Sequence, residues 1–344
     1  MTSPDTIQRT LAQSLRRLAV AKLPTTPYSR VALQRTVDAA EYYLDIYRHA
    51  LEQLLDRCAM SPADITVVDY GGGHGLLSLL AKRLGFAHVV YVDSNADAVQ
   101  TVRVLADMMG DGPDVVLQGD AATLRDWCAA NAVVPDALLA MDVIEHIYVL
   151  DEFFAALHDI SPRMRMVFTT ASNPYNRRVV LRLRRAMTLD ELGDSTHKGF
   201  LQLRREHIRR LHPDMPDKQL DYWAGQTRGL TYDDVTRAVE SQSPNLLLDP
   251  FNTCDPATGS WTERVLPLDD YRQLLAPYGF RLTVLPGRYN DHRHGPKAWA
   301  SRHYNRRIDK APQAEPASLR ERRRYRRAMR VAPFVYMYVA GEAS

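Results

Sequence analysis

The sequence predicts an α/β fold built on a parallel sheet, and three observations indicate it. Short apolar runs recur near residues 65–69, 88–93, 114–118, 136–141 and 165–170, helical patterns separate them, and a glycine-rich turn follows the first run. Parallel strands need such helical crossovers, which are right-handed and place helices on both faces of the sheet. Two later strands are expected at 281–285 and 332–340.

The composition is that of an ordinary globular protein. The chain has 344 residues, of which 45% are hydrophobic and 25% charged, with a formal net charge of +3. The chain is longer than a domain built on one such sheet needs to be, so insertions are expected. No run of about 18 apolar residues suits a membrane span, and the N-terminus lacks the apolar region of a signal peptide. Cys58, Cys128 and Cys254 form no C-x-x-C pair, so a reduced, cytoplasmic setting without a zinc or disulfide framework is expected.

Two helices are expected before the first strand. Residues 5–22 and 31–57 show helical periodicity, the second with a broad apolar stripe. Tyr28, Arg30 and Tyr43 lie in this region. They either touch a ligand or pack against the sheet.

The glycine-rich turn is the centre of the predicted site. The buried strand that ends at Asp69 is followed by Gly71, Gly73 and Gly75, and a helical pattern then runs to Gly85. A dinucleotide-binding turn needs G-x-G-x-x-G. Counted from Gly71, the third glycine of that motif would fall on Leu76, and counted from Gly73 it would fall on Ser78. The dinucleotide pattern therefore does not fit.

An acidic residue followed by glycines at alternate positions resembles the first motif of class I S-adenosylmethionine (SAM)-dependent methyltransferases. The resemblance implies a Rossmann-like seven-stranded sheet with helices on both faces, and SAM as the cofactor. The cofactor-binding residues expected on this basis lie in the turn and at the ends of strands. They are Asp69, Gly71, Gly72, Gly73, Asp93, Ser94, Asp120, Ala121 and Met141.

Two of these carboxylates end neighbouring strands. Asp93 follows the second strand about twenty residues after the turn, where a ribose diol needs hydrogen-bond acceptors; the alternative is a solvated residue at a strand end. Asp120 ends the third strand within Gly119-Asp120-Ala121. In the resembled family an aspartate at this place holds the exocyclic amine of adenine.

The fourth strand leads into Asp142-Val-Ile-Glu145-His146. This segment resembles the Glu-x-x-Glu-His segment of small-molecule O-methyltransferases of the ubiquinone-biosynthesis type, with Asp142 in place of the first glutamate. His146 is the candidate general base, with Glu145 or Asp142 orienting it. Two alternatives remain open: the three residues hold a divalent metal, or the carboxylates cap a helix N-terminus while the histidine packs beneath.

The fifth strand ends in a turn-forming cluster in which Asn173 and Tyr175 are candidate substrate contacts; a capping asparagine and a packed tyrosine are the alternative. Helical stretches near 177–188, 202–213 and 231–241 then predict an inserted lid. The first two are basic and either clamp an anionic substrate or face solvent. Residues 250–261 form a loop that could line a pocket.

The C-terminal part contains the largest departure from the resembled family. The last two strands should form an antiparallel hairpin, yet a basic insertion separates them at about 288–331. Seven arginines lie between Arg320 and Arg330, which indicates either attraction to nucleic acid, phosphate or anionic lipid or an exposed helix. His292, His294 and His303 are a weak metal signal without nearby cysteines.

These patterns divide the chain into four expected parts. Residues 1–60 are helices that cover the cofactor pocket, 61–172 the SAM-binding core, 173–264 the lid or substrate region, and 265–344 the end of the core with the basic insertion. The function expected is methyl transfer from SAM to a small-molecule, glycan-like or anionic acceptor, at oxygen. A nucleic-acid methyltransferase, a non-catalytic SAM-binding interaction protein and a nicotinamide dehydrogenase are the alternatives.

Overall fold

A seven-stranded mixed sheet forms the centre of the computed structural model, which describes residues 3–58, 60–245, 247, 249–292, 295–312, 314 and 316–341. The strand order is β3-β2-β1-β4-β5-β7-β6, and β7 is antiparallel to both of its neighbours. The strands are β1 (Thr66–Tyr70), β2 (His88–Asp93), β3 (Val115–Gln118), β4 (Ala137–Met141), β5 (Arg165–Thr170), β6 (Phe280–Pro286) and β7 (Val335–Gly341). The predicted seven-stranded α/β fold is confirmed.

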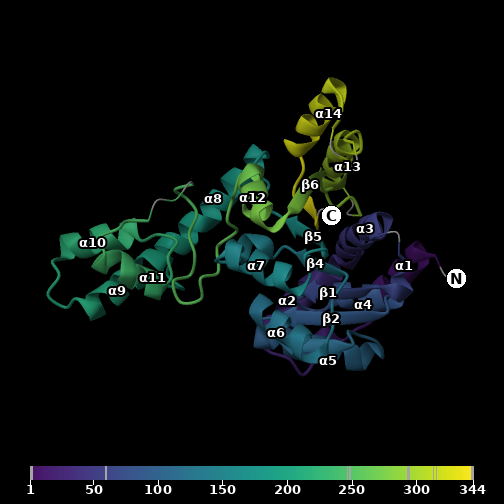
Figure 1. Cartoon of the computed structure of the whole chain (residues 1–344), viewed down its shortest axis with the longest axis horizontal. Coiled ribbons are helices and arrows are strands. Elements are labelled where there is room, and N and C mark those ends of the chain that lie inside the picture. The colour runs from purple at the N-terminus through teal and green to yellow at the C-terminus, as the bar shows by residue number, and fades with distance from the viewer. Residues whose placement is uncertain are drawn as a thin grey trace.

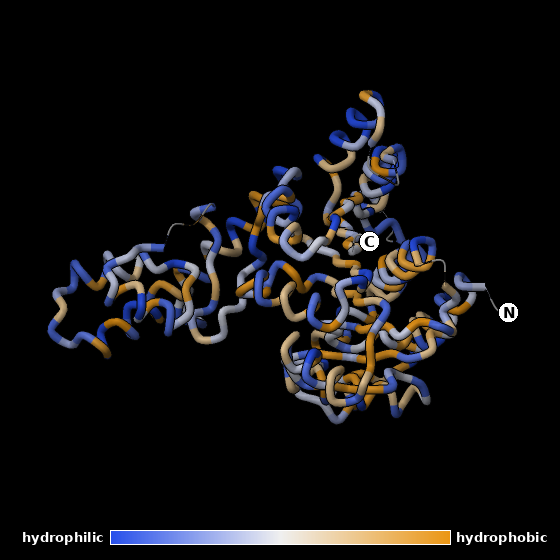
Figure 2. The backbone as a smooth tube through the Cα atoms, in the orientation of Figure 1, coloured by the Kyte–Doolittle hydropathy of each residue, from blue (hydrophilic) through white to orange (hydrophobic). Residues whose placement is uncertain are grey.

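Helices cover both faces of the sheet (Figure 1). The helices are α1 (Pro4–Arg16), α2 (Pro27–Asp38), α3 (Ala40–Cys58), α4 (Leu76–Arg83), α5 (Ala96–Met109), α6 (Ala121–Asn131), α7 (Leu150–Ile160), α8 (Arg177–Leu192), α9 (Phe200–Leu211), α10 (Asp217–Gln226), α11 (Tyr232–Glu240), α12 (Leu268–Leu275), α13 (Pro296–Ile308) and α14 (Leu319–Met329). One core packs α1, α3 and α4 against the sheet, and a second packs α6, α7 and α12 on the other face. Figure 2 shows the hydrophobic segments concentrated in these layers.

The N-terminal helices differ from the prediction at their ends. The helix expected over 5–22 ends at Arg16, and that expected over 31–57 is two helices, α2 and α3. Thr26 caps α2 by accepting from the Ser29 backbone N–H, and Pro27 follows as its first residue. This pair is a helix start signal that apolar periodicity alone does not reveal.

Helices α8 to α11 extend from the sheet as a separate helical group (Figure 1). Helix α10 was not predicted, because its segment reads as polar and follows a proline. A buried ion pair ties the group together: Arg204 of α9 donates to Glu191 of α8 at 2.6 Å and to the backbone oxygen of Ala224 at 3.0 Å. Thr253 donates to the same Glu191 at 2.7 Å, so this pair also anchors the loop that follows the helices.

The insertion between β6 and β7 contains α13 and α14, which project beyond the sheet (Figure 1). Helix α13 was not predicted. Helix α14 carries the arginine-rich segment and starts at a capping box formed by Ser318 and Glu321. Despite this insertion, β6 and β7 pair antiparallel over seven residues, from Phe280 opposite Gly341 to Pro286 opposite Val335. No helix within the described ranges has the length and apolar character that crossing a membrane requires.

Candidate active site

The turn between β1 and α4 has a backbone that only glycine adopts readily. Gly71, Gly73 and Gly75 have φ angles of +63°, +54° and +74°, in the left-handed region. A Cβ at Gly71 would lie 2.5 Å from Val143 Cγ2, whereas one at Gly73 would meet nothing within 4 Å. The turn is therefore packed tightly against the protein on one side and open on the other.

Replacing Gly71 with alanine should destabilise the fold more than replacing Gly110. Both glycines have φ of +63°, but a Cβ at Gly110 meets no atom within 4 Å. We expect the left-handed strain alone to cost Gly110→Ala about 1–2 kcal/mol, and the Val143 clash to cost Gly71→Ala about 1–3 kcal/mol more. Urea unfolding measures both variants. Equal losses would show that the turn does not pack as described.

Asp69 supports the turn from below. Its Oδ2 accepts from the backbone N–H of Ser78 at 3.0 Å and from the Ser78 hydroxyl at 2.6 Å, and the side chain is buried. It does not line the cavity described below. The structure therefore places this predicted cofactor ligand where it positions the first turn of α4.

Burial raises the pKa of Asp69 to about 7. Because this lies above the unfolded value of about 4, the folded protein holds the proton more tightly, and the free energy of unfolding falls as the pH rises from about 4 to about 7. Asp69→Asn should reduce that fall in urea unfolding measured across the same pH range. Asp126→Asn, at an exposed position on α6, should leave it unchanged. An identical pH profile for Asp69→Asn and wild type would contradict this account.

Asp93 joins the end of β2 to the turn. Its two oxygens accept from the backbone N–H of Gly73 at 2.9 Å and of Asn95 at 2.8 Å. Tyr91, from the same strand, donates its hydroxyl to the Gly73 backbone oxygen at 2.7 Å. The side chain of Asp93 thus lies beside the open glycine and holds the turn to the end of β2.

Asp120 lies at the same edge of the sheet, after β3. Its Oδ1 accepts from the backbone N–H and the hydroxyl of Thr123 at 3.0 and 3.1 Å, and the Thr123 backbone bond lowers its pKa. Asp93 and Asp120 line one cavity of about 1090 Å³. Four other predicted residues line it too: Gly71, Ser94, Ala121 and Asp142.

His146 also lines this cavity. Its Nδ1 lies 2.7 Å from the backbone oxygen of Trp261. A carbonyl oxygen only accepts, so in the neutral ring Nδ1 carries the proton and Nε2 holds a lone pair. The Trp261 backbone N–H donates in return to the His146 backbone oxygen at 3.2 Å. The loop that contains Trp261 therefore selects the tautomer that a general base needs.

Asp142 is strained and electrostatically perturbed. It has a positive φ of +55°, which is uncommon for a residue other than glycine, and its backbone N–H donates to the backbone oxygen of Thr169 at 3.1 Å. Asp142 lines the cavity and is exposed there, with neighbouring protein groups around its carboxyl group. Loss of solvation, followed by the charge of Glu263, raises its pKa to about 6.

Glu145 is turned away from the cavity. It is fully buried, and its Oε1 accepts from the backbone N–H of Ala171 at 2.9 Å. It therefore holds the end of β5, and it is not placed to act on a ligand.

The capping alternative is wrong as well, because no side chain caps the 3₁₀ turn Ile144–His146 or the start of α7. No three His, Cys, Asp or Glu side chains in the described parts of the chain are grouped as metal ligands; His294 lies outside those parts.

Four further predicted residues do not line the cavity. Gly72 packs under the turn, where a Cβ would lie 2.7 Å from the Tyr91 ring. Gly73 and Met141 are likewise outside the lining. Asn173 is fully buried and donates to the backbone oxygens of Met329 and Ala332 at 2.8 and 2.9 Å, so it fixes the end of α14 rather than a substrate.

Tyr175 is also outside the cavity lining and is 47% exposed at the surface. The sequence patterns missed other lining residues, because those residues belong to no motif. They include Tyr70, Asn95, Arg125 and Tyr148, whereas Tyr28, which the sequence did single out as a possible ligand contact, lines the cavity. Thr258, Gly259 and Ser260 of the predicted 250–261 loop do line the cavity.

A family model described as a methyltransferase domain matches residues 42–232, more than half of the chain. The chain belongs to this methyltransferase family. No curated protein sequence matches it. Solved structures similar to this methyltransferase include a putative methyltransferase from Bacillus halodurans C-125, with 12% identity over 85% of this chain and 98% of that one and a TM-score of 0.40. A SAM-dependent methyltransferase from Archaeoglobus fulgidus has 13% identity over 86% and 94%, with a TM-score of 0.38.

The cofactor of the methyltransferase is S-adenosylmethionine. The cavity residues fit this molecule. Asp93 and Asp120 line the cavity and offer acceptors for a sugar diol and for an amine. Gly73, outside the lining but bonded to Asp93, leaves open space where a side chain would stand. Both carboxylates lie on the same side of the sheet edge as the glycine turn, so one nucleoside can meet all three.

Proposed function

We propose that this methyltransferase transfers a methyl group from SAM to a hydroxyl of a small-molecule or glycan-like acceptor. The single observation that supports this proposal is the orientation of His146, whose Nε2 is left as a proton acceptor by the Nδ1 contact with Trp261. Transfer to a neutral hydroxyl needs a base, because the proton must leave as the oxygen–carbon bond forms.

When bound, SAM supplies an electrophilic methyl group on a sulfonium. Asp93, Asp120 and the glycine turn would hold the adenosyl part, while Asp142 and His146 would face the acceptor. His146 would accept the hydroxyl proton on Nε2 as the acceptor oxygen takes the methyl group from the sulfonium sulfur. S-adenosylhomocysteine and a methyl ether are the products. The protein contributes alignment, exclusion of water and one proton acceptor.

We also propose that the peripheral segments enclose this reaction. Tyr28, at the start of α2, and Thr258 to Ser260, after the helical group, both line the cavity. These positions support a cover formed by residues 1–60 and a lid formed by residues 173–264. The substrate roles predicted for Asn173 and Tyr175 do not form part of the proposal, since neither lines the cavity.

Release of S-adenosylhomocysteine tests the proposed function. The protein should release it when mixed with SAM and a panel of hydroxyl compounds, including phenols and simple glycosides, and mass spectrometry should detect a product heavier by one methylene. Amine or thiol acceptors that turn over while every hydroxyl compound fails would overturn the proposal.

Nucleic acid is the second candidate acceptor, and helix α14 favours it. Its arginines are exposed, and four of them, Arg320, Arg323, Arg324 and Arg327, line one groove. None of the four forms an ion pair with another described residue. Ala328 and Met329 are buried against the protein, so Leu319 is the one large apolar side chain that α14 exposes. A single leucine beside four arginines does not make an amphipathic membrane-binding face, and phosphate is the fitting partner.

Changing these four arginines to alanine tests that candidate. If α14 binds single-stranded RNA or DNA through phosphates, the slope of log K against log salt should become shallower by up to about 3 in the variant. Filter binding at several salt concentrations measures this slope. Nucleic acid would be excluded as the acceptor bound by α14 if the wild-type protein bound neither RNA nor DNA. It would also be excluded if the variant bound them with the wild-type slope.

A further inference from the structure

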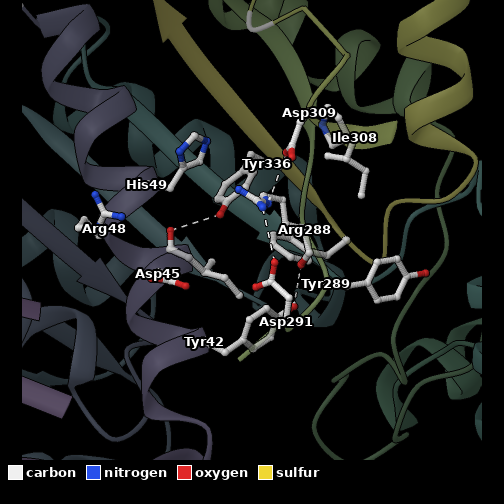
Figure 3. A pocket seen from close by; sticks show the side chains of 13 residues that line it. Tyr42, Asp45, Arg48, His49, Arg288, Tyr289, Asp291, Ile308, Asp309 and Tyr336 are labelled. Atoms are coloured by element: carbon white, nitrogen blue, oxygen red, sulfur yellow. Dashed lines mark hydrogen bonds and ion pairs between the residues drawn. The ribbon is translucent and has the colours of Figure 1, made fainter. Parts of the chain in front are cut away.

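A second cavity lies at the same edge of the sheet, between α3 and the ends of β6 and β7. We call it the α3–β6 pocket; Tyr42, Asp45 and His49 line it from α3, and Pro286, Arg288 and Tyr336 from the other side (Figure 3). Its volume is about 270 Å³, and it shares no lining residue with the cofactor cavity. It is near the lower limit for small-ligand sites, so it suits one ring-sized molecule.

The sheet register places this pocket near the proposed reaction. Met141, the last residue of β4, pairs with Thr169, and Thr170 of β5 pairs with Val335 at the start of β7. Two strand spacings, about 10 Å, therefore separate the end of β4 from the strand that borders the pocket. The Asp142 carboxylate is close enough to contribute to raising the pKa of Tyr336, although burial is the main cause.

The charged groups of the pocket are paired with one another or with neighbouring side chains. Arg288 lies between Asp291 at 3.6 Å and Asp309 at 3.5 Å (Figure 3). Asp45 accepts from Gln8 at 2.6 Å and pairs with His292. Three carboxylates and two guanidinium groups line the pocket, so a strongly anionic ligand is disfavoured, and the paired groups retain lone pairs and N–H donors for a neutral one.

Arg48, on the α3 side of the pocket, is likewise neutralised, since it pairs with Glu52 at 2.6 Å. His49 is held neutral, because burial and the nearby Arg48 and Arg288 lower its pKa. A neutral imidazole both donates and accepts. The pocket therefore combines donors and acceptors without requiring charge on the ligand.

Aromatic rings form the remaining walls. The rings of Phe334 and Tyr336 lie 5.2 Å apart, and His49 meets the edge of Tyr336 at 4.9 Å. Tyr42 donates its hydroxyl to the backbone oxygen of Arg288 at 3.0 Å, which fixes its ring across the entrance side. Aromatic faces beside paired donors and acceptors match the C–H faces and hydroxyls of a sugar ring.

From this chemistry we propose that the α3–β6 pocket binds a neutral sugar ring of the acceptor, about 10 Å along the sheet edge from the end of β4, the strand that leads into Asp142 and His146. This inference rests on the proposed function for its role as an acceptor subsite. It specifies a carbohydrate acceptor of at least two rings: one ring lies in the α3–β6 pocket and the next presents its hydroxyl to His146.

Saturation-transfer NMR on the full chain with S-adenosylhomocysteine tests the binding without needing turnover. The probes are methyl glycosides of common hexoses, a 6-deoxyhexose and an N-acetylhexosamine, with tyramine as a charged phenolic comparison. At least one glycoside should bind, and Tyr42→Ala and Arg288→Ala should each weaken it about tenfold. The matched variants Tyr222→Ala and Arg103→Ala, at exposed positions outside the pocket, should not.

Calorimetry with S-adenosylhomocysteine should give wild-type affinity for all four variants, which shows that they are folded. If no glycoside binds, if tyramine binds more tightly than every glycoside, or if the pocket variants bind sugar like wild type, the inference is wrong. Sugar binding that depends on Tyr42 and Arg288 while no hydroxyl compound is methylated would instead support the pocket and reject the proposed function.

Discussion

Asp93→Ala is expected to weaken S-adenosylhomocysteine binding by about a hundredfold. The substitution removes the carboxylate available to the ribose hydroxyls. It also releases the backbone N–H groups of Gly73 and Asn95, which the carboxylate holds at 2.9 and 2.8 Å. A hydrogen bond to a charged group contributes roughly 1.5–3 kcal/mol, and the loosened turn adds to the loss. Isothermal titration calorimetry measures the affinity.

Two variants separate these contributions. Asp93→Asn keeps one acceptor oxygen and the side-chain shape, so its affinity should fall between those of Asp93→Ala and wild type. Asp126→Ala removes a carboxylate whose side chain is 71% exposed and should bind as wild type does. Wild-type affinity in Asp93→Ala, with an unchanged melting temperature, would show that Asp93 does not hold the cofactor.

His146→Ala should lower kcat by about 10²- to 10⁴-fold, which is the usual contribution of a positioned general base. Since no described contact of His146 supports the glycine turn, S-adenosylhomocysteine affinity should change little. The rate is measured as S-adenosylhomocysteine release with whichever hydroxyl acceptor the wild-type protein methylates. His197→Ala, in a surface turn where the side chain is 42% exposed, is the matched control.

The pH profile tells whether His146 acts as a base. If His146 is the base, the pH dependence that it gives to wild-type kcat should be lost in His146→Ala. A variant that keeps wild-type kcat would contradict the assignment. A variant with reduced kcat but an unchanged pH profile would assign His146 a positioning role only.

The sheet and the glycine turn were predictable from the sequence, because local patterns encode them. Strands β1, β2, β4 and β5 are mostly buried on both faces and therefore appear as apolar runs; the edge strand β3 is only half-buried, but its residues 115–117 are apolar too. The αL positions of the turn leave glycine as the residue of choice, so Gly71, Gly73 and Gly75 mark it. Asp93 and Asp120 were predictable since the ends of parallel strands meet at one edge.

Side-chain direction was not predictable, and this explains the incorrect site assignments. Glu145 and His146 are adjacent, yet the carboxylate bonds to Ala171 while the imidazole faces the cavity. Asn173 follows β5 where substrates collect, but its amide is used by backbone oxygens more than 150 positions later in the chain. Local spacing contains no signal for such distant partners.

The α3–β6 pocket was invisible for the same reason. Tyr42 and Arg288, which meet through a hydrogen bond, are 246 positions apart, and the sheet order that joins β6 to β7 brings them together. The contact between His146 and Trp261 likewise spans 115 positions. A motif can identify a base, but the group that sets its tautomer emerges only from the fold.

A crystal structure with S-adenosylhomocysteine bound tests the central claim most directly. We expect the ribose hydroxyls on Asp93, the adenine amine on Asp120 and the amino-acid part beside the glycine turn, with the sulfur directed toward His146. Adenosine bound in the α3–β6 pocket, or a complex in which neither carboxylate contacts the ligand, would contradict the proposed site.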